Sequence, residues 1–178
     1  MTNAKNKWYM VTLIGKDRAT IVSHVTKALF EGGANLGETS MMRLGGNFSI
    51  MMMVEFSGST KELRDVLSSV TDSMGLHLHI DKIEAKLHEH IIPDVRISVY
   101  GADRAGIVSK VTEVLAEAGL NILDLESDVA GDKDKPLYIM HIEGEASEGI
   151  KTLESALQIV KDESGIDAEL IEIDTLIG

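Results

Sequence analysis

Residues 15–35 read GKDRATIVSHVTKALFEGGAN, and residues 101–121 read GADRAGIVSKVTEVLAEAGLN. The two stretches lie 86 residues apart, and 13 of their 21 positions are identical. A self-similarity at this period indicates two copies of a unit the size of a small domain. The shared positions include apolar residues at helical spacing, which packing explains. They also include polar residues around the start of each helix, which packing alone does not explain.

The length of the chain agrees with a duplication. Its 178 residues are enough for two small domains, each with a modest core. We expect a first domain at residues 1–87, a polar linker at 88–93 and a second domain at 94–178.

The net charge of −12 is distributed unevenly. Residues 1–87 carry 10 basic and 9 acidic side chains, whereas residues 88–178 carry 7 basic and 20 acidic ones. Direct nucleic-acid binding is not expected, because it requires a basic surface. The acidic half either favours a basic partner or serves solubility.

Other classes of protein are excluded by composition. Cysteine is absent, so disulfides, thiol catalysis and cysteine-ligated zinc do not occur. There is no apolar run of eighteen residues and no apolar segment of a secretory signal at the start, so we expect no membrane span and a cytoplasmic location.

Each copy shows the same succession of patterns. Residues 8–14 form an apolar, β-prone run, and 95–100 alternate with period two; each run is expected to stop at a glycine, Gly15 or Gly101. Apolar residues at helical spacing follow, and they are Ile21, Val22, Val25 and Leu29, with Ile107, Val108, Val111 and Leu115 in the second copy. Further strands are expected at 35–44, 48–56 and 76–81, with counterparts at 121–129, 137–143 and 166–173. Residues 44–47 predict a tight hairpin, residues 130–136 a longer loop, and a second helix precedes the last strand of each copy.

This order is β-α-β-β-α-β, twice. It predicts the α+β class, with two ferredoxin-like units whose antiparallel four-stranded sheets carry both helices on one face. Such a fold does not by itself define a function.

Polar residues recur where the first helix of each copy begins and where the next strand begins. They are Asp17, Arg18, Ser23 and Asn35, with Asp103, Arg104, Ser109 and Asn121 in the second copy. We expect the helix start and the strand start to lie at the same edge of the unit. Free N–H groups at a helix N-terminus suit a carboxylate, and asparagine offers both a donor and an acceptor. The alternative is that the aspartates cap the helices, the asparagines make turns and the serines merely occupy the helix.

The pattern G-x-D-R-x-G-I-V-S-x-V-T-x-x-L-x-x-x-G-x-N-I at residues 101–122 resembles an ACT domain, and residues 15–36 are a variant of it. The resemblance covers essentially the whole chain as two tandem units. It fits best the two-ACT proteins related to the glycine cleavage system transcriptional repressor.

The resemblance implies an amino-acid site between paired domains, at the loop before the first helix and the start of the second strand. The ligand-binding residues it implies are Asp103, Arg104, Ala105, Gly106, Ile107 and Asn121, with Asp17, Arg18, Ala19, Thr20, Ile21 and Asn35 in the first copy. Thr20 stands where the second copy has Gly106, and glycine allows close approach to the backbone. The second site is therefore the favoured one.

The resemblance also implies a regulatory protein that is not an enzyme. Its ligand would be a small amino acid such as glycine or serine, without a cofactor, and the units would pair within the chain or in a homo-oligomer. The partner would be a regulatory protein such as a transcription activator. A ligand-free interaction module is the alternative, whereas an enzyme lacks support because no nucleotide-binding, zinc-protease or nucleophile motif is present.

Two smaller patterns have two interpretations each. His77, His79, His88 and His90 are spaced for zinc, but the solvent face of a strand is the preferred interpretation, so no metal site is expected. Residues 51–53 are three methionines, which predicts that both faces of that strand are covered, by the other copy, by another subunit or by core packing alone.

Overall fold

The computed structural model describes residues 7–84, 91–102, 106–132 and 135–173. The chain divides into two compact units, Met1–His88 and Glu89–Gly178. Residues 88–90 of the expected linker lie outside the described residues, as do 85–87 before it. Residues 91–93 have no regular structure.

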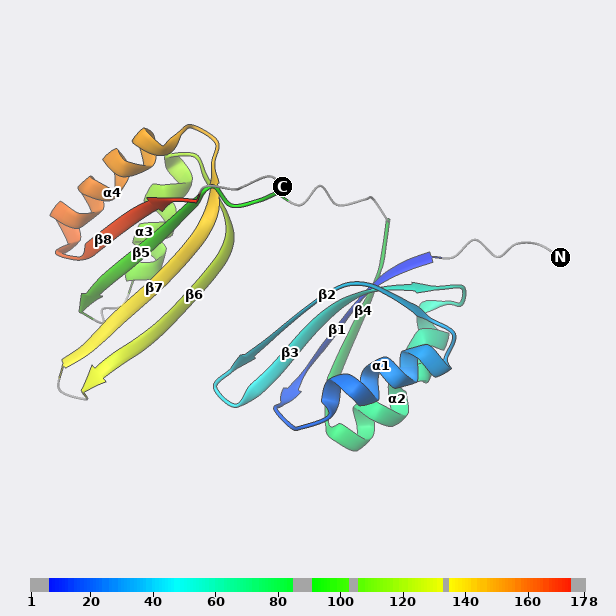
Figure 1. The fold of residues 1–178 in the computed structure, drawn as a ribbon. Helices are drawn as coiled ribbons and strands as arrows, with labels where there is room; N and C mark the ends of the chain where they lie inside the picture. The colour runs from blue at the N-terminus through cyan, green and yellow to red at the C-terminus, as the bar shows by residue number, and fades with distance from the viewer. Residues whose placement is uncertain (1–6, 85–90, 103–105, 133–134, 174–178) are drawn as a thin grey trace. The chain divides into compact units, whose positions relative to one another are not determined.

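The first unit consists of a four-stranded antiparallel sheet with two helices on one face (Figure 1). Its elements are β1 (Lys7–Lys16), α1 (Ile21–Glu31), β2 (Asn35–Leu44), β3 (Asn47–Phe56), α2 (Thr60–Met74) and β4 (His77–Ile83). The strand order is β2-β3-β1-β4, so that the first strand of the chain lies inside the sheet.

The second unit repeats this arrangement. Its elements are β5 (Val95–Ala102), α3 (Ile107–Glu117), β6 (Leu120–Asp132), β7 (Lys135–Ala146), α4 (Ile150–Ser164) and β8 (Asp167–Glu172). The strand order is β6-β7-β5-β8, with antiparallel pairing throughout. The α+β class and the two ferredoxin-like units are therefore confirmed.

Each core lies between the sheet and its two helices. Alternate residues of the inner strands point toward the helices and are fully buried, and these are Tyr9, Val11 and Leu13 of β1 and Val95, Ile97 and Val99 of β5. Ile21, Val25 and Leu29 of α1 are buried against them, as the helical spacing predicts. Val22 was expected in the same stripe, but 38% of its surface is exposed, because it lies beside the buried stripe and not within it.

The inner strands were expected to stop at Gly15 and Gly101, but both continue past the glycine. β1 continues to Lys16 and β5 to Ala102, and both glycines stay paired with the neighbouring strand. A Cβ atom on Gly15 would lie 2.7 Å from a Leu76 methyl, and one on Gly101 would lie 2.8 Å from Ile166. These glycines therefore permit close packing against the chain that enters the last strand; they do not end the first one.

The two hairpins also differ from each other. Gly45 and Gly46 form the expected tight turn, with φ angles of 56° and 76° that favour glycine. In the second unit, the expected loop at 130–136 is mostly strand, since Ala130 pairs with Leu137 and Gly131 with Pro136.

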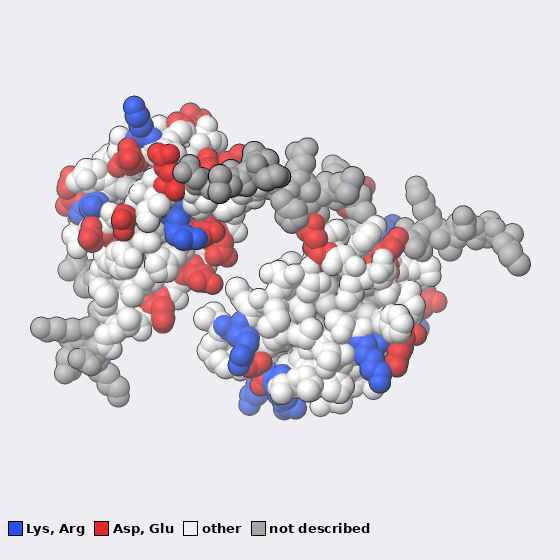
Figure 2. Space-filling view, viewed as in Figure 1, with Lys and Arg blue, Asp and Glu red and all other residues white. Residues whose placement is uncertain are grey.

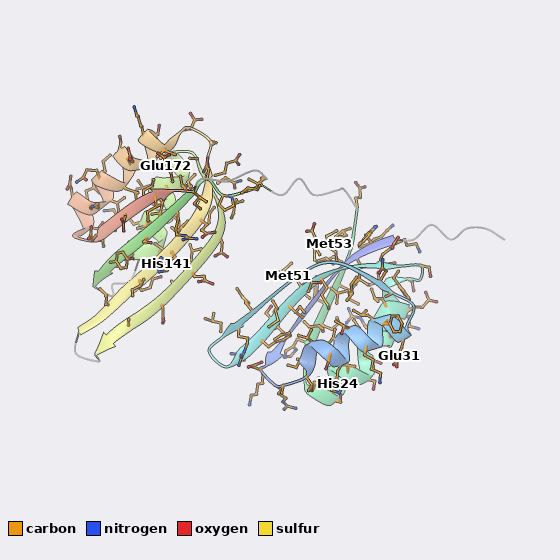
Figure 3. The ribbon with its side chains drawn as sticks, in the orientation of Figure 1. His24, Glu31, Met51, Met53, His141 and Glu172 are labelled. Carbon is orange, nitrogen blue, oxygen red and sulfur yellow. The ribbon has the colours of Figure 1, made fainter. Side chains whose placement is uncertain are left out.

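The three methionines at 51–53 are buried to different degrees on the two faces of the sheet. Met52 points toward the helices and is fully buried, while Met51 and Met53 point to the other face of the sheet (Figure 3). Met53 and the ring of Trp8 both lie against Gly37, and Met53 is only 8% exposed. Met51 is 48% exposed within its unit, so core packing alone does not cover it, and its cover by the other copy or by another subunit stays a prediction.

Helix α2 begins with a capping box. The Ser59 hydroxyl accepts a hydrogen bond from the Glu62 N–H, and the Ser59 N–H donates to the Glu62 carboxylate at 2.7 Å. The backbone and then the hydroxyl of Ser59 lower the pKa of Glu62 from its ordinary value of 4.5, because both stabilise the ionised form. Its counterpart α4 has Gly149 as its N-cap residue, without a side-chain cap among the described residues.

Replacing Ser59→Ala is expected to lower the unfolding free energy of the first unit by about 1 kcal/mol, since a helix N–H loses its acceptor. The single tryptophan of the chain, Trp8, lies on β1, so its fluorescence in urea reports this unit. Ser69→Ala, at an exposed position of the same helix, is the control and should leave the midpoint unchanged or raise it slightly.

Replacing Glu62→Gln should change how stability depends on pH. Because the folded-state pKa of Glu62 is lowered, its ionised form stabilises the fold above pH 4.5, and this contribution is lost as pH falls through the folded-state value. Urea midpoints of the wild type and the variant should therefore differ at neutral pH and converge in acid. A difference that stays constant down to pH 3 would contradict this role.

Candidate functional site

A cavity of about 620 Å³ opens to solvent at the end of the first unit where β1 finishes. It is lined by Asp17, Arg18, Ala19, Thr20, Ile21, Val22, Ser23, Met41, Arg43 and Phe48. Five of the six residues that were expected to bind ligand in the first copy, 17–21, therefore lie together around one hollow.

Helix α1 starts at this cavity in an unusual backbone conformation. Its N-cap residue, Thr20, has φ 74° and ψ 0°, in the left-handed region, which a β-branched residue rarely adopts. No side chain among the described residues caps the helix, and no acid lies in its first turn. The first N–H groups of α1, which have no acceptor within the helix, are thus available to an anion.

The Thr20 carbonyl accepts three hydrogen bonds that hold this conformation. The backbone N–H of His24 donates at 3.0 Å, the Ser23 hydroxyl at 2.9 Å, and Nδ1 of His24 lies 2.8 Å away, where it donates in the matching tautomer. In the second unit, Gly106 takes the same position with φ 90°, and Lys110 replaces His24. Ser23 recurs as Ser109, and the backbone N–H of Lys110 likewise donates to the Gly106 carbonyl, so the His24 imidazole is the contact that distinguishes the first unit.

Asp17 is not a helix cap, contrary to one of the sequence-based alternatives. Its carboxylate forms an ion pair with the guanidinium of Arg43 on β2, and its N–H donates to the Gly46 carbonyl at 3.0 Å. α1 begins only at Ile21, too far along the chain for Asp17 to cap it. Asp103, its counterpart, lies outside the described residues together with Arg104 and Ala105.

Arg43 was missed by the sequence analysis. The signal was present in the tight turn at Gly45 and Gly46, which sets the register of the hairpin and pairs Arg43 with Phe48. Figure 2 shows basic side chains gathered at this end of the first unit, to which Lys16 at the end of β1, Arg18 in the turn before α1 and Arg43 near the end of β2 belong.

Asn35 does not lie at the cavity, so the expected proximity to the helix start is wrong. Asn35 pairs with Glu55, whereas the end of β1 pairs with Asn47. Eight residues of strand separate these positions, roughly 26 Å. The reason is topological: α1 runs back along the sheet, so β2 starts at the far end.

The second unit has the same geometry within its described residues. Gly106 is the N-cap of α3, Ile107 is the first helical residue, and Asn121 pairs with Glu145 near the opposite end of the sheet. The Asn121 side-chain amide lies 3.5 Å from the Glu145 carboxylate, a long contact that leaves its hydrogen-bonding capacity largely free.

The histidine pattern places His77 and His79 on the sheet face away from the helices, opposite Ile14 and Thr12. His79 contacts Asp81 at 2.8 Å, and His88 and His90 lie outside the described residues. Within the described part of the chain, no three histidine or acidic side chains converge as a metal would require. None of the described helices is both long enough and apolar enough to cross a membrane.

Comparison with protein families finds a match for each of the two units. An ACT-domain profile matches residues 8–81, and another matches residues 95–165. The chain belongs to the ACT-domain family. The two ACT domains coincide with the two repeats of the sequence and with the two sheets of the structure.

Individual relatives agree with this assignment. A UPF0237 protein of Listeria innocua is 33% identical over 78 residues, which make up 42% of this chain and 88% of the relative. The glycine cleavage system transcriptional repressor of Escherichia coli is 22% identical over 146 residues, 80% of this chain and 76% of that protein. Similarity to that repressor, together with the tandem ACT domains, supports a regulatory role.

Solved structures share the two-unit fold. An unknown protein from Galdieria sulphuraria matches with a TM-score of 0.77 and 27% identity over 96% of this chain and 100% of that one. A structure provisionally assigned as a glycine cleavage system transcriptional repressor matches with a TM-score of 0.69 and 17% identity over 96% and 99%.

The backbone of Thr20 yields a stability prediction. Thr20→Gly should raise the unfolding free energy of the first unit by roughly 0.5–1 kcal/mol, because glycine adopts the left-handed region without strain, which outweighs its larger unfolded-state entropy. The same change at Thr26, inside α1, should lower it. Urea unfolding followed by Trp8 fluorescence compares the two; destabilisation by both would contradict strain at Thr20.

Proposed function

We propose that this protein is a non-enzymatic regulator that binds a small amino acid at its ACT domains and thereby alters its contact with a regulatory protein. The family resemblance indicates glycine or serine as the ligand class. The name of the Escherichia coli relative suggests control of glycine cleavage genes as the process.

The observation that carries the proposal is the cavity at the start of α1. It collects residues 17–21, which the family resemblance marks for ligand binding, around uncapped helix N–H groups. An α-carboxylate fits such N–H groups, and the Asp17 carboxylate suits an ammonium group. A free amino acid presents both.

The position of Asn35 supports a composite site. Since Asn35 lies at the far end of its own sheet, the asparagine at the start of a second strand, Asn35 or Asn121, could line this cavity only from another ACT domain. We infer that the binding-competent form pairs two ACT domains, within the chain or in a homo-oligomer, so that one domain supplies that asparagine to the other. The wide opening of the cavity in the isolated unit agrees with a missing wall.

A second candidate function is a ligand-free interaction module. Exposed apolar side chains favour it: Met42 is 61% exposed, Leu44 72% and Met51 48%. These residues belong to β2 and β3, and a protein partner would cover them. The two functions differ in whether any amino acid stabilises the chain.

Thermal unfolding against the twenty amino acids at millimolar concentration tests the proposal. A ligand at a hundredfold excess over its Kd stabilises by about 2.7 kcal/mol, which raises the Tm of a domain of this size by roughly 10–20 °C. We expect one or two amino acids to do so. Ala19→Leu, which fills part of the cavity from an exposed position, should abolish the shift.

The matched control is Ala116→Leu, at an exposed position of α3 outside the cavity. It should bind as the wild type does. A panel without any shift would leave the interaction module as the function, and an unchanged shift in Ala19→Leu would place the ligand elsewhere.

A further inference from the structure

One difference between the two units lies on the second strand, beside the helix start. In the first unit, the neighbours across the sheet from β1 to β2 are Gly15, Phe48 and Arg43. In the second unit, the corresponding neighbours from β5 to β6 are Gly101, Tyr138 and Val129. Gly15 and Gly101 are equivalent positions of the repeat, so Arg43 and Val129 are equivalent as well.

Arg43 is held at the cavity by a fixed partner. Asp17 is anchored through its N–H to the Gly46 carbonyl, and its side chain is only 22% exposed. The Arg43 side chain, at 69% exposure, reaches this carboxylate from β2 and lines the cavity. A guanidinium carries five N–H donors, of which one carboxylate takes at most two. Donors therefore remain for a ligand.

The cavity lining carries more positive charge than a neutral amino acid would balance. Its described lining contains two arginines, Arg18 and Arg43, and one carboxylate, that of Asp17. A zwitterionic ligand brings one ammonium and one carboxylate, which Asp17 and Arg18 can match. Because Asp17 is then shared between Arg43 and the ligand ammonium, the lining keeps one positive charge in excess, which the second carboxylate of an acidic amino acid would match.

We propose that Arg43 sets the ligand preference of this cavity by binding the side-chain carboxylate of an acidic amino acid, aspartate or glutamate. Asp17 acts as a positioning residue that aims the guanidinium. Val129 offers no such donor in the second unit. This inference rests on the proposed function that the cavity binds an amino acid, and it replaces the glycine or serine class, for this cavity, by an acidic one.

Calorimetric titration of the full chain with aspartate, glutamate, glycine and serine at constant ionic strength tests the proposal. The wild type should bind an acidic amino acid more tightly than glycine. Arg43→Gln should weaken acidic ligands about tenfold, as expected for a lost charged hydrogen bond, and affect glycine much less. Arg43→Lys should keep most of the preference, because it keeps the charge.

Arg64→Gln is the matched control, since Arg64 lies on α2 and its guanidinium donates to the Leu78 carbonyl, outside the cavity. It removes the same charge and should leave every affinity unchanged. Urea unfolding of each variant verifies that it is folded.

Each other outcome has a definite meaning. Equal weakening of all four ligands by Arg43→Gln, or no weakening, overturns the role of Arg43 and leaves the proposed function intact. A wild type that binds glycine or serine more tightly than the acidic amino acids also overturns it. If the wild type binds none of the four, the inference fails, and the unfolding panel of twenty amino acids decides whether the proposed function fails with it.

Discussion

The structure depends on the antiparallel pairing of β1 with both β3 and β4, repeated by β5 with β7 and β8. Because the first strand lies inside the sheet, its alternate side chains are buried beneath the helices, and the chain must return over the same face as α1. The end of β1, the start of α1 and the β2–β3 hairpin are thereby brought to one end of the unit. The cavity is a consequence of this arrangement, and so is the separation of Asn35 from it.

Duplication preserves what the pairing requires and leaves the rim of the cavity free to change. The buried residues of α1 recur in α3 as apolar side chains, and Gly15 recurs as Gly101 because the close packing beneath it recurs. Thr20, by contrast, is matched by Gly106, and its left-handed backbone places the carbonyl where the Ser23 hydroxyl and the His24 imidazole contact it. Nearly identical folds therefore present different chemistry at equivalent positions.

Sequence patterns predict what local periodicity and turn chemistry determine. The order of the strands and helices, the buried stripe of α1 and the turn at Gly45 and Gly46 follow from short-range patterns, and the structure confirms them. The cavity residues 17–21 are contiguous, so a motif suffices to collect them. The positions of Arg43 and Asn35 could not be predicted from a motif. Only the direction of α1 and the register of β2 show that Arg43 lies near the helix start and Asn35 does not. The ion pair of Asp17 with Arg43 has no local signature at all.

The charge asymmetry of the chain has a structural location. On the sheet face away from the helices, the second unit carries Asp124, Glu126, Glu143 and Glu169, of which Glu143 pairs with Arg96. The same face of the first unit carries Trp8, Met10, Met51 and Met53 together with the acidic Glu55 and Asp81. The helix-covered faces of both units, by contrast, are uniformly apolar. The excess of acid in the second half therefore does not disturb its core, since these carboxylates lie where each sheet is uncovered within its unit. Selection acting on those faces and on the cavity rim can change what each domain contacts while the pairing that builds the fold stays the same.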